Sequence, residues 1–360
     1  MKLDLNNNLE GFKRPFLIAG PCSVESEEQV MTIAKTLAKD GKTELLRGGI
    51  WKPRTRPDSF EGMGEEALPW LVNAGRESGL PVTTEVANAK HVELALKAGV
   101  DVLWIGARTT VNPFAVQEIA DALSGTDITV MVKNPINPDL MLWIGAMERL
   151  AKAGINDLVA IHRGFSVYKH PKYRNAPNWE IPIALLEKMP DIPIICDPSH
   201  ISGKREGILN VSQKAMDLNF TGLMIETHHT PDEAWSDAKQ QITPGNLFAL
   251  IDQIVLRYED MSDEVQNYIE RMRAKIAAQD DRLFEILSNR MKLAEEVGIF
   301  KRENDITILQ QDHWRRVIEN RLNQSGDFHL TKEFVRALMD AIHQESIRHQ
   351  TKVMNPDLKV

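Results

Sequence analysis

The 360-residue sequence predicts an α/β protein: a (β/α)8 barrel followed by an all-α domain of three helices. The first observation is that short apolar, β-branched runs alternate with amphipathic helical stretches over about the first 245 residues, which is typical of parallel βαβ units. The second is that 17 of 18 prolines lie at or before Pro244, and 19 of 21 glycines at or before Gly245. A long segment nearly free of both residues indicates helix.

Eight runs are expected to form the strands, and eight such units fit a closed barrel. The alternative is an open, doubly wound sheet. It is less favoured because no Gly-x-Gly-x-x-Gly motif follows the first run. The expected strands are 16–22, 44–51, 81–86, 102–107, 129–134, 158–164, 193–199 and 222–227.

The rest of the chain is expected to form helices over about 265–300, 308–322 and 331–352. A first helix of about 36 residues would be about 54 Å long, more than one small domain can cover. We therefore expect an intertwined homodimer through the helical domain, with a coiled-coil spacer as the alternative. The expected division is a barrel over 1–258, a polar linker at 259–266 and a helical domain over 267–360.

Composition excludes several classes of protein. The chain is 42% hydrophobic and 26% charged, as in soluble globular proteins, and its net charge of −8 argues against non-specific nucleic-acid binding. No apolar run approaches the ~20 residues of a membrane span, and the first residues lack the apolar region of a signal peptide. Two cysteines, Cys22 and Cys196, exclude a disulfide scaffold. We expect a cytoplasmic protein without nucleic-acid or membrane partners.

Cations gather where the expected strands end. In a barrel, the carboxyl ends of the strands line the active site. Guanidinium groups match the geometry of phosphate and carboxylate, so a positive pocket in an acidic chain favours two anionic substrates, or one with several anionic groups. The alternative for any one of these cations is a structural ion pair. The six are Arg47, Lys52, Arg54, Arg108, Lys133 and Arg163.

A second set of strand-end residues consists of potential metal ligands. Cys22, His200, Glu226 and Asp237 come from the first, seventh and eighth runs and the segment beyond, which become neighbours when a barrel closes. One sulfur, one nitrogen and two oxygen ligands suit a divalent transition metal such as Mn, Fe, Co or Zn. Taken singly, a cysteine is more often a small buried apolar residue.

Several motifs together resemble the short type I-beta class of 3-deoxy-D-arabino-heptulosonate 7-phosphate (DAHP) synthase. They are GPCSVES, LRGGIWKPRTRPDSFEGMG, WIGAR, VMVKN, IHRG, CDPSHISGKR, LMIETH and WSDAKQQITP, and they span about residues 14–258 in order. The related octulosonate-phosphate synthases carry Lys-Ala-Asn-Arg-Ser where this chain has the segment 52–55, so the resemblance favours erythrose 4-phosphate as the sugar substrate. The chain departs from the family at TTVNPF, after Arg108.

The resemblance implies a role for each strand-end residue. Phosphoenolpyruvate would bind Arg108, Lys133 and Arg163, with Arg47 and Lys52 at its phosphate and carboxylate. Arg54 and Thr55 would bind erythrose 4-phosphate. A divalent ion, Mn²⁺ first among the candidates, would bind Cys22, His200, Glu226 and Asp237. Proton transfer is open between His162, Lys52 and metal-bound water.

The segment over about 265–352 resembles the all-helical class of chorismate mutase, beginning with MRAKIAAQDDRLFEILSNRMKLAEEVGIFK. The resemblance implies that cations hold the two carboxylates of chorismate, and that Lys301 and Gln350 stabilise charge on the breaking ether oxygen. In the second helix Gln310, His313 and Trp314 stand where the family commonly has an Asp and an Arg-Glu pair. The implied site residues are Arg273 from the partner chain, Arg290, Lys301, Ser346 and Gln350.

Together, the resemblances imply a bifunctional enzyme of aromatic amino acid biosynthesis. Since the first expected strand begins near Phe16, no regulatory domain is expected before the barrel. We therefore expect the mutase domain also to mediate feedback inhibition by prephenate or chorismate. The alternatives are a helical domain that only binds a regulator, or one that only dimerises.

Overall fold

The computed structural model describes residues 15–53, 59–168, 172–257 and 263–356. The chain divides into two compact units, Met1–Tyr258 and Glu259–Val360, each of which is described by itself. Helix α11 begins at Asp263, inside the segment expected to be a linker.

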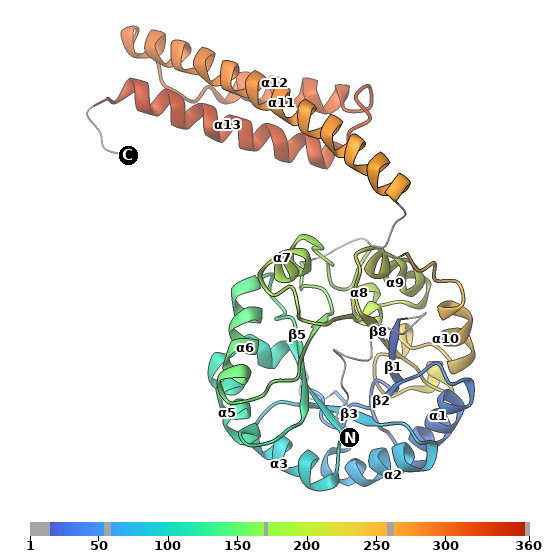
Figure 1. Cartoon of the computed structure of the whole chain (residues 1–360). Coiled ribbons are helices and arrows are strands. Elements are labelled where there is room, and N and C mark those ends of the chain that lie inside the picture. Colours follow the sequence, from blue (N-terminus) through green and yellow to red (C-terminus); the bar gives the residue numbers. More distant parts are fainter. Residues whose placement is uncertain (1–14, 54–58, 169–171, 258–262, 357–360) are drawn as a thin grey trace. The chain divides into compact units, whose positions relative to one another are not determined.

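The first unit is a closed barrel of eight parallel strands in the order β1 to β8 (Figure 1). The prediction of eight strands is confirmed. An open doubly wound sheet is excluded because β1 pairs with both β2 and β8. The strands are β1 (Phe16–Gly20), β2 (Leu45–Arg47), β3 (Val82–Val86), β4 (Val102–Ile105), β5 (Thr129–Lys133), β6 (Leu158–His162), β7 (Ile194–Cys196) and β8 (Gly222–Glu226).

Two apolar layers hold the barrel together. Alternate strand residues point into the barrel and out toward the helices. Trp104 and Ile161 belong to the interior cluster, whereas Leu103 and Ala160 belong to the larger cluster between strands and helices. Burial of each large apolar side chain contributes about 1.5–3 kcal/mol. The same alternation directs His162, which follows Ile161, toward the helices.

Helices surround the strands, as Figure 1 shows. Side-chain caps begin several of them: Ser26 accepts from the Gln29 N–H at 3.1 Å, and Thr243 accepts from the Asn246 N–H at 3.2 Å. The α-helices are α1 (Glu27–Asp40), α2 (Leu68–Ser78), α3 (Ala89–Ala98), α4 (Ala107–Thr110), α5 (Pro113–Leu123), α6 (Leu140–Lys152), α7 (Glu180–Lys188), α8 (Pro198–Ser202), α9 (Ile208–Asp217) and α10 (Pro244–Ile251).

The register between β1 and β8 positions two of the predicted metal ligands. Gly20 pairs with Glu226, so Cys22 follows the end of β1 beside the end of β8. Gly20 has a φ of +145°, and an added Cβ would lie 2.1 Å from the Arg47 carbonyl oxygen. Only glycine lets the end of β1 approach β2 this closely.

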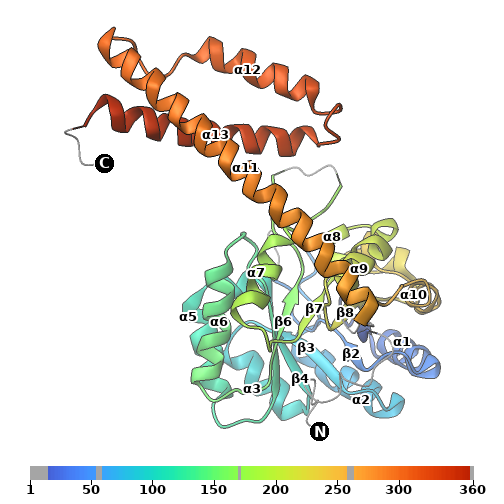
Figure 2. The same cartoon turned by 45° about the horizontal axis from the view of Figure 1, so that its top comes forward.

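The second unit contains three helices, as predicted: α11 (Asp263–Glu303), α12 (Gln311–Gln324) and α13 (Lys332–Met354). At 1.5 Å per residue, the 41-residue α11 is about 62 Å long. Figure 2 shows a short connection joining α12 to α13. A Cβ at Gly298 would lie 2.7 Å from the Val353 side chain, so α11 and α13 pack closely.

Helix α11 carries large apolar side chains that the described chain leaves exposed. They recur along most of its length, which is unusual for a helix of a monomeric soluble protein. They include Ile276, Phe284, Ile286, Leu293 and Phe300, each at least 60% exposed. Within the described ranges, no helix has the combined length and apolar character needed to cross a bilayer.

Candidate active sites

A polar pocket of about 280 Å³ lies among the residues that follow the barrel strands. Four of the six predicted cations line it, together with Glu85, and Arg47 is buried at the end of β2. The predicted Arg54 and Thr55 lie outside the described residues. The lining cations are Lys52, Arg108, Lys133, Arg163 and Arg174.

Arg174 is a pocket residue that the sequence reasoning missed. Its guanidinium lies 3.1 Å from Asp237 Oδ1 and 2.7 Å from Gln240 Oε1. It belongs to the long segment between β6 and α7, well beyond the end of β6. Its only signal in the sequence was the presence of a further arginine in that segment. Arg174 also donates to Asp237, one of the predicted metal ligands.

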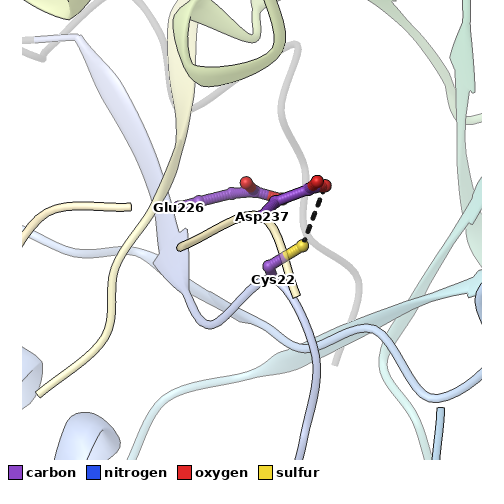
Figure 3. A group of neighbouring side chains, drawn as sticks. All are labelled: Cys22, Glu226 and Asp237. Carbon is purple, nitrogen blue, oxygen red and sulfur yellow. Dashed lines mark hydrogen bonds between the residues drawn. The ribbon is translucent and has the colours of Figure 1, made fainter. Parts of the chain in front are cut away.

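The predicted metal ligands come together beside this pocket. Single ligand atoms of Cys22, Glu226 and Asp237 lie within 4.8 Å of one another, and the Cys22 thiol donates to Asp237 Oδ2 at 3.4 Å (Figure 3). His200 Nε2 lies 3.7 Å from Glu226 Oε1, so the fourth residue borders the cluster. This sulfur, nitrogen and oxygen donor set fits a divalent transition metal.

A buried carboxylate, Asp197, orients His200. Asp197 Oδ2 lies 2.8 Å from His200 Nδ1 and 3.0 Å from Lys133 Nζ, and Oδ1 accepts from the His200 backbone N–H. Burial would raise the pKa of Asp197, but His200 and Lys133 hold it well below its usual range. Because the carboxylate engages Nδ1, it leaves Nε2 directed at the metal cluster. The sequence reasoning did not select Asp197.

Cations also surround the cysteine of the cluster. Lys52 Nζ donates to Cys22 Sγ at 2.6 Å and to the Cys22 carbonyl at 3.0 Å, and Arg47 Nη2 lies 3.1 Å from Glu226 Oε1. Burial raises the pKa of the Cys22 thiol to about 12, and Glu226 adds to the rise while Lys52 opposes it. A thiolate at this position therefore requires further positive charge, which a metal ion supplies.

Arg163 lines the pocket, and its burial and the neighbouring cations disfavour its charged form. Burial lowers the pKa of its guanidinium to about 10, and the nearby charges of Arg174 and Arg108 lower it further, while Asp197 opposes them. Its Nη1 donates to Asn175 Oδ1 at 2.9 Å, and its backbone N–H donates to Asn134 Oδ1 at 2.7 Å. Bound anions offset the repulsion between cations that lie this close together.

His162 does not reach the pocket. It is fully buried on the outer side of β6, where its ring lies 5.2 Å from Trp179 and 5.8 Å from Phe165 between centroids. Burial lowers its pKa to about 3, and Arg163 lowers it further. The expectation that His162 transfers a proton to substrate therefore needs correction, because neighbouring strand residues point to opposite faces and Arg163 takes the inward position.

A second pocket, of about 330 Å³, lies within the helical unit and gathers four of the five residues predicted there. Arg290 donates to the Ser346 hydroxyl, and Lys301 Nζ lies 2.6 Å from the Ile308 carbonyl oxygen and 3.3 Å from Gln350 Oε1. The fifth residue, Arg273, is absent from the described lining. Its side chain is 67% exposed and lies 3.1 Å from Glu270.

The residues at which the chain departs from the mutase pattern also line this pocket. Gln310, His313 and Trp314 face it from the start of α12. The Trp314 ring stacks on the ring of His343 from α13, with centroids 3.7 Å apart and planes 8° apart. Burial lowers the pKa of His343, and Arg290 lowers it further, which favours the neutral imidazole.

The closed barrel and its cation-lined pocket beside a metal-ligand cluster define an enzyme that acts on polyanionic substrates. Comparisons with known proteins then narrow this class. The model of the DAHP synthetase I family matches residues 4–261, and that of chorismate mutase type II matches residues 272–351.

Two related proteins and one crystal structure are similar to this chain. The phospho-2-dehydro-3-deoxyheptonate aldolase of Thermotoga maritima is 30% identical over 247 residues, which are 69% of this chain and 70% of the relative. Its crystal structure superposes with a TM-score of 0.60 at 28% identity, covering 66% of this chain and 67% of the other. A 2-dehydro-3-deoxyphosphooctonate aldolase of Variovorax paradoxus is 30% identical over 268 residues, 68% of this chain and 91% of the relative.

The chain belongs to the DAHP synthetase I family. Its C-terminal helices form a chorismate mutase type II domain, so the protein is a DAHP synthase fused to a chorismate mutase. Both enzyme activities serve aromatic biosynthesis.

Proposed function

We propose that the barrel pocket condenses phosphoenolpyruvate with erythrose 4-phosphate, and that the helical pocket rearranges chorismate to prephenate. The observation that carries the first assignment is the gathering of five cations around a single pocket. Two phosphorylated substrates, one of them also a carboxylate, bring enough negative charge to occupy these groups.

The inward-facing cations divide between the two substrates. Arg108, Lys133 and Arg163 hold phosphoenolpyruvate, and Arg47 and Lys52 approach its phosphate and carboxylate. Arg47 is buried, and its Nη2 lies 3.1 Å from Glu226 Oε1. Beyond the described residues, Arg54 and Thr55 would bind erythrose 4-phosphate. The fixed positive charges stabilise the anionic intermediate until phosphate leaves.

Cys22, His200, Glu226 and Asp237 would hold a divalent ion. Their mixed donor set fits Mn²⁺, with Fe, Co and Zn as alternatives. When bound, the ion supplies Lewis-acid polarisation of the aldehyde. The chain itself contributes Lys52, whose Nζ lies at both the cluster and the pocket, as the group best placed to hold or deliver a proton.

Metal removal tests this assignment. A chain stripped with EDTA is expected to lose synthase activity, and added Mn²⁺ is expected to restore it. The mutase rate of the same sample serves as the internal control, because the helical pocket contains no part of the cluster. Full synthase activity after verified metal removal would contradict the proposed ligand set.

The helical pocket suits a pericyclic rearrangement, which needs neither an acid nor a base. Arg290 binds a carboxylate with Ser346 beside it, and Lys301 and Gln350 face the ether oxygen whose bond breaks. The contacts that support this reading are those of Lys301 with Gln350 and of Arg290 with Ser346. Stabilisation of the developing charge lowers the barrier. Turnover of chorismate by the purified chain, followed by loss of its ultraviolet absorbance, tests the assignment.

We further propose that the active form is a homodimer through the helical domain. The exposed apolar side chains of α11 need a partner, and Arg273 lies too far along this helix from Arg290 to reach the same ligand: 17 residues correspond to about 25 Å. Arg273 from the partner chain would complete each pocket. The same chain is proposed to act in the cytoplasm, where its two free, buried cysteines stay reduced.

Feedback inhibition by prephenate or chorismate is the remaining part of the proposal. It requires only that the ligand bind one arrangement of the protein better than another. Titration of the synthase reaction with prephenate, at fixed Mn²⁺, is expected to reduce the rate to a saturating limit. A synthase rate that does not change with prephenate would contradict the proposed feedback inhibition, and the fusion would then only join two activities in one chain. Saturable inhibition without any mutase turnover would instead favour a helical domain that serves only as a regulatory module.

A further inference from the structure

A short segment after the 3-10 helix η5 (Ala238–Gln240) runs beside the carboxyl end of β8. The backbone N–H of Ile242 donates to the Glu226 carbonyl at 3.1 Å, and the Ile242 carbonyl accepts from the His228 N–H at 2.9 Å. The residues just before Ile242 are therefore fixed beside the end of a strand that carries a predicted metal ligand.

Gln241 lies in this segment, is completely buried, and uses both ends of its side-chain amide. Its Oε1 accepts from the backbone N–H of Cys22 at 3.0 Å, and its Nε2 donates to the backbone carbonyl of Ser236 at 2.8 Å. Cys22 is a predicted ligand, and Ser236 directly precedes another, Asp237. One side chain therefore joins two ligand-bearing segments that lie 215 residues apart in the sequence.

Asp237 has an unusual backbone conformation, which its neighbours maintain. Its φ of +47° and ψ of +34° lie in the left-handed region, which is uncommon for residues other than glycine. Such a conformation persists only where the surrounding structure fixes it. The Gln241 amide fixes the Ser236 carbonyl directly before this residue. After it, the Gln240 N–H donates to the Asp237 carbonyl at 3.1 Å. The Cys22 thiol donates to the Asp237 carboxylate held in this way, at 3.4 Å (Figure 3).

We propose that Gln241 is a positioning residue of the barrel site. Its amide holds the segment that carries Cys22 against the segment that carries Asp237, so the thiol and the carboxylate face each other before an ion binds. Gln241 is absent from the described residues that line the barrel pocket, so it acts through these neighbours. The inference rests on the proposed function, because it gives Gln241 a role toward the proposed ligands.

An amide suits this position because it offers an acceptor and a donor side by side. The Cys22 N–H needs the acceptor, the Ser236 carbonyl needs the donor, and both residues are buried. A methionine of similar length at position 241 would leave both backbone groups without a partner, which is unfavourable away from water. The two segments are then expected to move apart and admit water, which separates the thiol from the carboxylate.

The test measures the Mn²⁺ affinity of the metal-stripped full chain from the electron paramagnetic resonance of the free ion. For Gln241→Met we expect the Kd to rise about 10–100-fold, as is typical when a group that orients metal ligands is lost. Gln241→Asn keeps the amide but is too short to span both backbone groups. For this milder variant we expect a rise on the order of tenfold. A Kd within about twofold of wild type, in either variant once folded, would overturn the proposal.

Gln29 provides a matched control, because it is a second buried glutamine whose amide pairs with two backbone groups. Its Oε1 accepts from the Glu25 N–H at 3.2 Å, and its Nε2 donates to the Ser23 carbonyl at 3.0 Å. Both partners belong to one segment, so Gln29 does not join two ligand-bearing segments. Gln29→Met is expected to lower the melting temperature as Gln241→Met does, but to keep the Kd for Mn²⁺ within about twofold of wild type. An equal rise in Kd in both variants would contradict a specific role for Gln241.

Absorption spectra with Co²⁺ separate failure of this proposal from failure of the ligand assignment. A thiolate bound to Co²⁺ gives a charge-transfer band in the near ultraviolet, and Cys22→Ser provides the spectrum without it. At saturating Co²⁺, Gln241→Met is expected to show a weaker band, whereas Gln29→Met should keep the wild-type band. Identical spectra for wild type and Cys22→Ser would contradict the ligand assignment itself. A wild-type band that Gln241→Met retains in full, with unchanged affinity, would overturn only the positioning role.

Discussion

Replacing Asp197 by asparagine removes one charge and leaves the side-chain shape unchanged. An amide oxygen still accepts from the His200 N–H, now 3.1 Å from Oδ1. The other position, 2.8 Å from His200 Nδ1 and 3.0 Å from Lys133 Nζ, becomes an NH₂ group. That group donates to Nδ1, so the ring proton moves to Nε2, the nitrogen proposed to bind metal.

The expected size of the effect follows from these contacts. Loss of the partner that orients a histidine ligand costs about 10–100-fold in metal affinity, or about 1.4–2.8 kcal/mol. Lys133 also loses its buried counter-charge, which typically costs about 3–5 kcal/mol of stability when one partner of a buried pair is removed. Metal affinity and global stability should therefore both fall.

The assay is a Mn²⁺ titration of the metal-stripped chain, followed by electron paramagnetic resonance of the free ion. The matched control is Asp139→Asn, which alters another helix-capping aspartate, at the start of α6, away from the lining of the barrel pocket. The Kd for Mn²⁺ is expected to rise about 10–100-fold in the first variant and to stay constant in the second. A folded Asp197→Asn chain whose Kd lies within about twofold of wild type would refute the orienting role.

Two stability predictions follow from the barrel. The pKa of His162 is about 3 in the fold, mainly through burial, and about 6.5 in the unfolded chain; acidification from about pH 6.5 to 3 therefore protonates only the unfolded state and lowers stability. Between pH 6.5 and 5 protonation of this imidazole in the unfolded chain lowers the free energy of unfolding of the wild type by about 2 kcal/mol. Urea unfolding at the two pH values should therefore show the difference in free energy of unfolding between His162→Leu and wild type shifting by that amount in favour of the variant. An unchanged difference would mean that the imidazole is solvated. Gly20→Ala should cost about 2 kcal/mol or more, because its Cβ meets the Arg47 carbonyl at 2.1 Å. A melting temperature within about 1 °C of wild type would contradict the close approach of β1 and β2.

The barrel could be predicted in detail because each strand leaves a local signal. Eight apolar runs separated by helical stretches fix the topology, and the rule that active sites lie at strand ends then selects the site residues. Cys22 and Glu226 lie far apart in the sequence, yet the pairing of β1 with β8 follows from closure of the barrel. Four predicted cations line one pocket for the same reason.

The positions of the remaining site residues could not be predicted from the ends of the expected strands. His162 and Arg163 are adjacent, and only one of two adjacent strand residues can face the pocket. The sequence did not reveal which, and the structure selects Arg163. Arg174 reaches Asp237 from a long loop whose path no local pattern predicts. The Trp314–His343 contact joins two helices, so it depends on how they pack rather than on either periodicity.

The central claim is that one chain holds two separate catalytic sites. Its most direct test measures both reactions on the same samples of wild type, Lys52→Ala and Lys301→Ala. Lys52→Ala is expected to lose at least about 100-fold in synthase kcat/KM and to keep the mutase rate, and Lys301→Ala is expected to do the opposite. Parallel loss of both activities in either variant would contradict separate sites. Retention of mutase activity in Lys301→Ala would instead contradict the role proposed for Lys301.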